Sequence, residues 1–178
     1  MGDIGKAIAF FKALGFERLS LDSFSDKVIA QKAVYLLQLK GVKLGFNYNL
    51  YLRGPYSPEL AREMYAHRSE VEKLETTAAL SAKENAEARE FNETFGLKPS
   101  ILEAAATYSY FREGGQSALE ALKSTKKQKP FLSETQVALG TNAAKEYLFP
   151  PSKKVLEEMK REFAPWERAA VEDWGKCA

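Results

Sequence analysis

One segment, residues 25–40, limits the fold more than any other part of this sequence. Its apolar side chains occupy most of the circumference of an α-helix: Val28, Ile29, Ala33, Val34, Leu36, Leu37 and Leu39. Ser25 is placed to cap this helix and Gly41 to end it. Because a helix that is apolar on most sides has to be buried, we expect it at the centre of the N-terminal half, with other elements packed around it.

Capping residues and apolar spacing predict the other elements. The expected helices span residues 4–14, 58–74 with a break near Arg68, 81–95, 100–113, 117–125 and 133–147, followed by one that starts after Ser152 and is interrupted at Pro165. Alternating apolar residues predict a strand over 46–52, with 42–45 as its partner, and 74–81 fit a further short strand or hairpin. The sequence therefore predicts a mainly α protein with a small β-strand element and a helix-turn-helix-like C-terminal half.

A junction near Gly96 and Pro99 separates two halves of the chain. Residues 1–96 are expected to form an N-terminal helical lobe that carries the short strand and a Gly-Pro turn. Residues 97–178 are expected to form the helix-turn-helix-like lobe with the C-terminal helices. One compact domain containing both lobes is the alternative, since 178 residues fit a single domain.

Charge and cysteine content exclude several classes of protein. The 26 Lys and Arg side chains exceed the 24 Asp and Glu by only two, which is too little for a nucleic-acid field over the whole surface. The single cysteine, Cys177, excludes an intrachain disulfide and a cysteine-rich metal site. We find no signal peptide and no membrane segment in the sequence, and we therefore expect a cytoplasmic protein with no membrane partner.

The turn formed by residues 53–57 is the first candidate binding surface. Pro55 fixes the backbone between a strand and a helix, while Arg53 and Tyr56 project side chains of the two types that dominate many protein interfaces. We take Tyr51, Arg53, Tyr56 and Lys32 as candidate protein-binding residues. The alternative is that Gly54 and Pro55 only make the turn and Tyr56 packs in the core.

Lys32 places an ammonium group among apolar neighbours on the central helix. Desolvation lowers the pKa of a lysine, so Lys32 could be an activated amine. The plainer alternative is a side chain that extends to solvent or pairs with an acid such as Asp22 or Asp26.

The three helices expected between residues 100 and 147 have the lengths and the sharp corner of a helix-turn-helix unit. Between Arg112 and Lys154, eight basic residues stand against four acidic ones. The candidate DNA-binding residues are Lys123, Lys126, Lys127 and Lys129 for phosphates, and Thr135, Asn142 and Lys145 on the outer face of the third helix. A purely structural three-helix unit is the alternative.

No residue pattern indicates catalysis. His67 lies on an apolar helix face near Glu63 and Glu70, but one histidine without a nearby cysteine does not complete a known zinc site. The sequence contains no phosphate-binding loop and no nucleophile elbow. We therefore predict a protein that is not an enzyme, with no catalytic residues, no metal and no cofactor.

Several short motifs carry a family resemblance. The block from Gln31 to Gln38, with Gly54-Pro55-Tyr56-Ser57 after it and Lys129-Pro130-Phe131 in the second half, resembles the YwgA-like group of prokaryotic proteins. More distantly, the Lys32 helix and the Gly54-Pro55 turn are similar to the Panacea (SocA-like) antitoxin domain, in which an aromatic-rich segment precedes Gly-Pro. Here Tyr51-Leu52-Arg53 replaces the usual tryptophan-containing segment, and Tyr56 replaces a common valine.

The resemblance implies a binding role, and the residues give it two candidate surfaces. We expect a non-enzymatic cytosolic binding module, antitoxin-like or regulatory, that recognises a partner protein such as a toxin encoded nearby. The alternative is a DNA-binding transcriptional regulator of the helix-turn-helix type that contacts double-stranded DNA. A homodimer is compatible with either function.

Overall fold

The computed structural model describes residues 2–150 together with residues 157, 161 and 164. The chain divides into two compact units, Met1–Leu148 and Phe149–Ala178, and everything below concerns the first. The boundary expected at residues 96 and 97 falls inside this first unit. Apart from residues 157, 161 and 164, the segment in which a helix is expected after Ser152, with its interruption at Pro165, lies outside the described residues.

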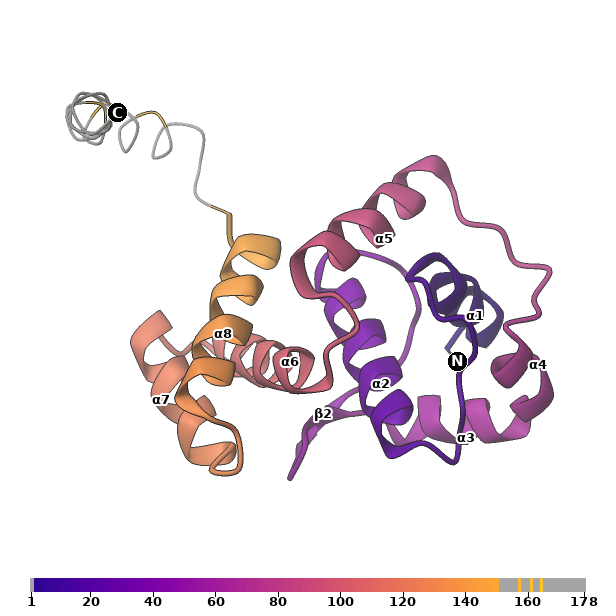
Figure 1. Ribbon diagram of the computed structural model, residues 1–178, viewed down its shortest axis with the longest axis horizontal. Helices are drawn as coiled ribbons and strands as arrows, with labels where there is room; N and C mark the ends of the chain where they lie inside the picture. The colour runs from indigo at the N-terminus through magenta and orange to yellow at the C-terminus, as the bar shows by residue number, and fades with distance from the viewer. Residues whose placement is uncertain (1, 151–156, 158–160, 162–163, 165–178) are drawn as a thin grey trace, which may run out of the picture. The chain divides into compact units, whose positions relative to one another are not determined.

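The described residues form eight helices and one two-stranded sheet, which confirms the mainly α fold (Figure 1). The elements are α1 (Ile4–Ala13), α2 (Phe24–Leu39), β1 (Asn49–Tyr51), β2 (Gly54–Tyr56), α3 (Pro58–Ala66), α4 (Arg68–Lys73), α5 (Ala82–Phe95), α6 (Pro99–Glu113), α7 (Ala118–Gln128) and α8 (Glu134–Leu148). In this part of the chain, no helix combines the length and the apolar character needed to cross a membrane.

Helix α2 is buried as its sequence predicts. Leu36 and Leu37 have no exposed surface, and the helix packs against α6 and β2 (Figure 1). The cap is Ser23 rather than Ser25, because the Ser23 side chain accepts a hydrogen bond from the backbone N–H of Asp26. The helix therefore begins at Phe24, earlier than a cap at Ser25 allows.

The two strands form a tight antiparallel hairpin in which Tyr51 lies opposite Gly54. The partner expected from residues 42–45 is wrong, since the carbonyl of Leu44 accepts a hydrogen bond from Asp3 instead. Gly54 has a φ of +86°, and a Cβ at this position would lie 2.4 Å from Oγ1 of Thr107 on α6. A glycine is therefore required both by the turn and by the helix behind it.

The hairpin leads directly into α3. Ser57 caps that helix and Pro58 is its first residue, both as predicted. The predicted break is also confirmed, since α3 ends at Ala66 and α4 begins at Arg68. Residues 74–81 contain no strand, and Oγ1 of Thr76 donates instead to the carbonyl of Gly5 in α1.

Helices α6, α7 and α8 lie where the sequence predicts three helices with a sharp corner. Ser133 and Gln136 form the predicted capping pair at the start of α8, each accepting a hydrogen bond from the other's backbone N–H. Helix α6 begins at Pro99, with Lys98 rather than Ser100 at its cap position. Helix α8 packs so closely on α6 that a Cβ added at Gly140 would lie only 2.6 Å from the Cβ of Ala104.

Candidate binding site

A pocket of about 320 Å³ opens between α2, α3 and the hairpin. The residues that line it are the apolar Leu21, Val28, Ala61 and Met64, the aromatic Phe24, Tyr56 and Tyr65, the polar Gln31, and the cationic Lys27, Lys32 and Arg53. Three of the four residues predicted to bind a protein, Lys32, Arg53 and Tyr56, thus contribute to one cavity. The fourth, Tyr51, lies beside it, with its ring centre 5.4 Å from that of Tyr56 in an edge-to-face contact.

Lys32 is the buried cation of this pocket, with 2% of its surface exposed. Its Nζ donates a hydrogen bond of 2.6 Å to the carbonyl oxygen of Pro55. Both forms of the plainer alternative are wrong: the side chain does not extend to solvent, and its partner is neither Asp22, which pairs with Arg68, nor Asp26, which accepts from the backbone N–H of Ser20. Both acids are used to hold the loop that precedes α2.

Burial lowers the pKa of Lys32 to about 7, and repulsion from the ammonium of Lys129 adds to this effect. The carboxylate of Glu103 acts in the opposite direction. At neutral pH, the ammonium and the free amine of Lys32 are therefore both populated.

A buried ion cluster lies behind the hairpin. Nζ of Lys129 is 2.9 Å from Oε1 of Glu103 and 3.1 Å from the carbonyl oxygen of Leu52. Nη1 of Arg53 approaches Oε2 of the same carboxylate at 3.6 Å. One carboxylate therefore faces two cations directly, and the positive excess of this region grows when Lys32, at longer range, is also protonated.

Arg53 reaches out of this cluster to the surface. Its guanidinium carbon lies 4.2 Å from the ring centre of Phe131 and 5.3 Å from that of Phe24. These rings come from the loop before α8 and from the start of α2, so three distant parts of the chain meet at one side chain. Such stacking on aromatic faces restricts the orientation of the guanidinium group.

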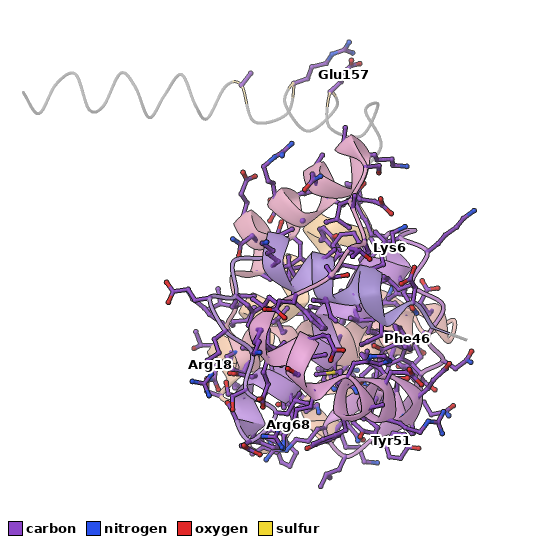
Figure 2. All side chains as sticks on the ribbon, turned by 90° about the vertical axis from the view of Figure 1, so that its right-hand side faces the viewer. Lys6, Arg18, Phe46, Tyr51, Arg68 and Glu157 are labelled. Atoms are coloured by element: carbon purple, nitrogen blue, oxygen red, sulfur yellow. The ribbon has the colours of Figure 1, made fainter. Side chains whose placement is uncertain are left out.

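Exposed apolar side chains gather at this place. Of the seven large apolar side chains that the described residues leave exposed, five lie on the hairpin, against Arg53 or at the pocket: Phe24, Tyr51, Leu52, Tyr65 and Phe131. Leu52, at the tip of the hairpin, is 75% exposed, and Tyr51 lies at the periphery of the molecule (Figure 2). We call Phe24, Tyr51, Leu52, Arg53 and Phe131 the Arg53 surface.

The hairpin is held rigidly at its base. The side-chain amide of Gln31 donates to the carbonyl of Ser57 at 3.0 Å and accepts from its N–H at 2.9 Å. On the other side, Nε2 of Gln128 donates to the carbonyl of Tyr51 at 3.1 Å. Helices α2 and α7 thus fix the backbone on both sides of the exposed tip.

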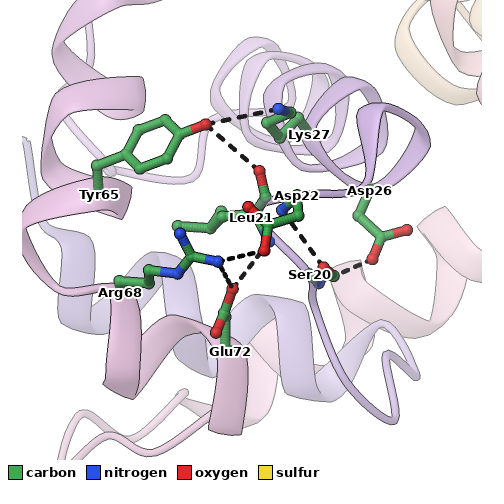
Figure 3. Close-up of polar contacts among 8 residues, drawn as sticks. All are labelled: Ser20, Leu21, Asp22, Asp26, Lys27, Tyr65, Arg68 and Glu72. Carbon is green, nitrogen blue, oxygen red and sulfur yellow. Dashed lines mark hydrogen bonds and ion pairs between the residues drawn. The ribbon is translucent and has the colours of Figure 1, made fainter.

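The outer rim of the pocket is a network of polar contacts (Figure 3). The hydroxyl of Tyr65 donates to the carbonyl of Leu21 at 3.3 Å and accepts from Nζ of Lys27 at 3.5 Å. Arg68 pairs with Asp22 and Glu72, and Glu72 also accepts from the N–H of Leu21. These contacts tie the segment before α2 to α3 and α4.

The residues predicted to bind DNA lie on α7, α8 and the loop after α7. Thr135, Asn142 and Lys145 are exposed on one face of α8, as the helical rotation predicts, and Lys123, Lys126 and Lys127 are exposed on α7. Lys129 differs from the expectation of a phosphate contact, because its side chain has no exposed surface. Nζ of Lys126 lies 2.9 Å from Oε1 of Glu134.

His67 lies between α3 and α4 near two acids. Its Nε2 is 4.0 Å from Oε2 of Glu63, and its Nδ1 is 3.9 Å from Oε1 of Glu70. Among the residues that the structure describes, no group of three or more His, Cys, Asp or Glu side chains is arranged to hold a metal ion.

Sequence reasoning missed Glu103, Phe24, Leu52 and Phe131. Glu103 carries a readable signal, since it is the lone acid within the apolar run from residue 101 to 106. Comparison with protein-family models, curated proteins and solved structures found no match for this chain. The function therefore has to be argued from the geometry of the site.

Proposed function

We propose that this protein is a non-enzymatic, cytoplasmic binding module that recognises a partner protein through the Arg53 surface. The observation that carries the proposal is the gathering of exposed aromatic and aliphatic side chains around one restrained arginine. Exposed apolar groups that gather in one place are typical of protein interaction sites, and arginine and aromatic residues supply much of the binding energy there.

The rigidity of the hairpin supports the same proposal. Gln31 and Gln128 hold its backbone from both sides, and the side chain of Arg53 is stacked on two rings. Binding by a surface that is already ordered loses less conformational entropy than binding by a mobile loop. The contacts therefore favour a surface organised for docking.

The geometry favours a protein partner over DNA. Two of the four lysines expected to contact phosphates are engaged within the molecule, since Lys129 is buried against Glu103 and Lys126 pairs with Glu134. The exposed face of α8 carries Lys145 as its basic residue and no arginine, which is the commonest reader of bases in the major groove.

An antitoxin-like role for the module rests on the Lys32 helix and the Gly54-Pro55 turn. In this role, the partner is a small toxic protein encoded by the neighbouring gene. The test consists of two titrations of the purified protein, one against the product of the adjacent gene and one against the upstream duplex DNA. Each titration is carried out at two salt concentrations.

The proposal expects protein binding that weakens at least about fivefold in Arg53→Ala, a loss of roughly 1 kcal/mol. The same binding should be unchanged when Lys123 and Lys127 are both replaced by alanine. DNA binding that weakens steeply with salt and is lost with the two lysines, but not with Arg53→Ala, would favour the regulator instead.

A further inference from the structure

We infer that the pocket between α2, α3 and the hairpin binds a small carboxylic acid with an apolar body, of the arylalkanoate type. This inference concerns the cavity beside the Arg53 surface, with which it shares Phe24 and Arg53, and it does not depend on the partner proposed above. Its basis is the charge of the lining, its apolar part and the contacts of Lys32.

The charge of the lining selects an anion. Three cationic side chains line the pocket, namely Lys27, Lys32 and Arg53, and none of the described residues that line it is acidic. The carboxylate that acts on Lys32, that of Glu103, lies behind the hairpin and is bonded to Lys129. A bound carboxylate would therefore supply a second negative charge to a region in which cations outnumber acids.

Lys32 offers the donors that such a ligand needs. A protonated lysine carries three N–H groups, and the structure gives that of Lys32 one acceptor, the carbonyl of Pro55. Because Lys32 is only 2% exposed and also lines the cavity, a ligand oxygen is the partner that could compensate its desolvation. Arg53 adds a planar guanidinium fork, which suits a carboxylate.

The rest of the lining selects an apolar body. Leu21, Val28 and Met64 supply aliphatic walls and Phe24 an aromatic one. A volume of about 320 Å³ lies at the lower end of the range typical of small-molecule pockets, so the cavity fits a compact acid rather than a large cofactor. Inorganic phosphate or acetate would leave these walls uncovered.

Proton linkage gives the inference a distinctive signature. The charged groups that face Lys32 are Lys129, Arg53 and Glu103, and together with burial they hold its pKa at about 7. A bound carboxylate favours the ammonium form of Lys32, so above pH 7 the binding of the ligand should be coupled to the uptake of a proton by Lys32. Affinity should therefore fall as the pH rises from about 6.5 to about 8.5, while the ligand itself stays fully ionised.

The test is a calorimetric or NMR titration of the full chain with 3-phenylpropionate, with 3-phenylpropanamide and acetate as matched probes. We expect a dissociation constant of about 1 mM or tighter for 3-phenylpropionate at about pH 6.5. Binding of the neutral amide and of acetate should each be at least about tenfold weaker, as expected when a charged hydrogen bond or an apolar contact is removed. Equal binding of either probe would overturn the inference.

Two variants connect the binding to this cavity. Lys32→Met should weaken 3-phenylpropionate binding at least about tenfold and abolish its pH dependence, while Lys145→Met on α8 should change neither. If Lys32→Met does not fold, as judged by its melting curve, Ala61→Phe takes its place, since it fills the cavity from α3 and leaves the three cations intact. Unchanged binding in a folded variant of either kind would contradict the assignment.

A final arm of the titration distinguishes a free acid from an acidic side chain of a partner protein. The capped dipeptide acetyl-Phe-Glu-amide presents the same carboxylate and the same ring within a peptide. Binding no tighter than that of 3-phenylpropionate supports a free small acid. Binding at least about fivefold tighter would overturn that ligand class and assign the pocket to a docked protein segment.

Discussion

The ammonium group of Lys32 on α2 lies 2.6 Å from the carbonyl oxygen of Pro55 on β2. This contact joins the buried central helix to the hairpin that carries the Arg53 surface. Because Lys32 also lines the pocket, one side chain connects the core, the hairpin and the cavity. Its protonation state should therefore influence the stability of the whole unit.

We predict that stability rises with pH above 7 and that Lys32 causes much of this rise. Its folded pKa of about 7 lies below its ordinary value of 10.5, so between these two values the unfolded chain binds more protons than the folded one. Raising the pH therefore removes a cost of folding that is fully present below pH 7. Between pH 7 and 9, the free energy of unfolding should rise about 2 kcal/mol more in the wild type than in Lys32→Met.

Urea unfolding at several pH values measures this difference. The pH range of this test ends near pH 9. Above it, tyrosines of the unfolded chain ionise, and because the buried Tyr35, Tyr48 and Tyr147 have raised pKa values, the free energy of unfolding then falls with pH. Parallel pH profiles for the wild type and Lys32→Met would show that the lysine is not desolvated as the structure indicates.

Glu103→Gln should destabilise the protein by about 3 kcal/mol, because it leaves the buried ammonium of Lys129 without a compensating charge. The matched control is Glu134→Gln, which removes the carboxylate of an exposed pair with Lys126. The control should leave the urea midpoint unchanged, since exposed ion pairs contribute little. Equal midpoints for both variants would mean that the Lys129–Glu103 pair does not stabilise the fold.

Gly54→Ala should cost more than about 2 kcal/mol, because it adds a steric clash with Thr107 to the strain of a positive φ. Gly115→Ala separates the two causes, since Gly115 has nearly the same φ of +88° and a Cβ added there would meet no atom within 4 Å. We expect that control to cost about 1 kcal/mol. Thermal or urea unfolding of both variants gives the comparison, and equal losses would exclude a clash at α6.

Local patterns in the sequence are sufficient to predict the helices. The apolar circumference around Leu36 and Leu37 predicts a buried α2, and Ser57 with Pro58 predicts the start of α3, because these signals act within one or two helical turns. The outward face of α8, with Asn142 exposed and Val137 buried, follows from rotation alone.

The contacts that make the site could not be predicted in this way. Phe24 and Phe131 meet at Arg53 although more than one hundred residues separate them in sequence. Lys129 lies in a lysine-rich segment, which is typical of an exposed surface, yet it pairs with Glu103 inside the molecule. The prediction that residues 42–45 pair with β1 is wrong, because β1 pairs with β2. Alternation of apolar residues identifies a strand, but it does not reveal which segment provides the backbone hydrogen bonds.

The most direct test of the Arg53 surface compares two exposed leucines. Leu52 is at the tip of the hairpin and Leu139 is on the exposed side of α8, with exposed fractions of 75% and 56%. The measurement is the affinity of Leu52→Asp and Leu139→Asp for the product of the adjacent gene. We predict a loss of at least about tenfold for Leu52→Asp, with unchanged affinity for Leu139→Asp and near wild-type melting curves for both. Unchanged affinity for Leu52→Asp, or an equal loss for Leu139→Asp, would contradict the account.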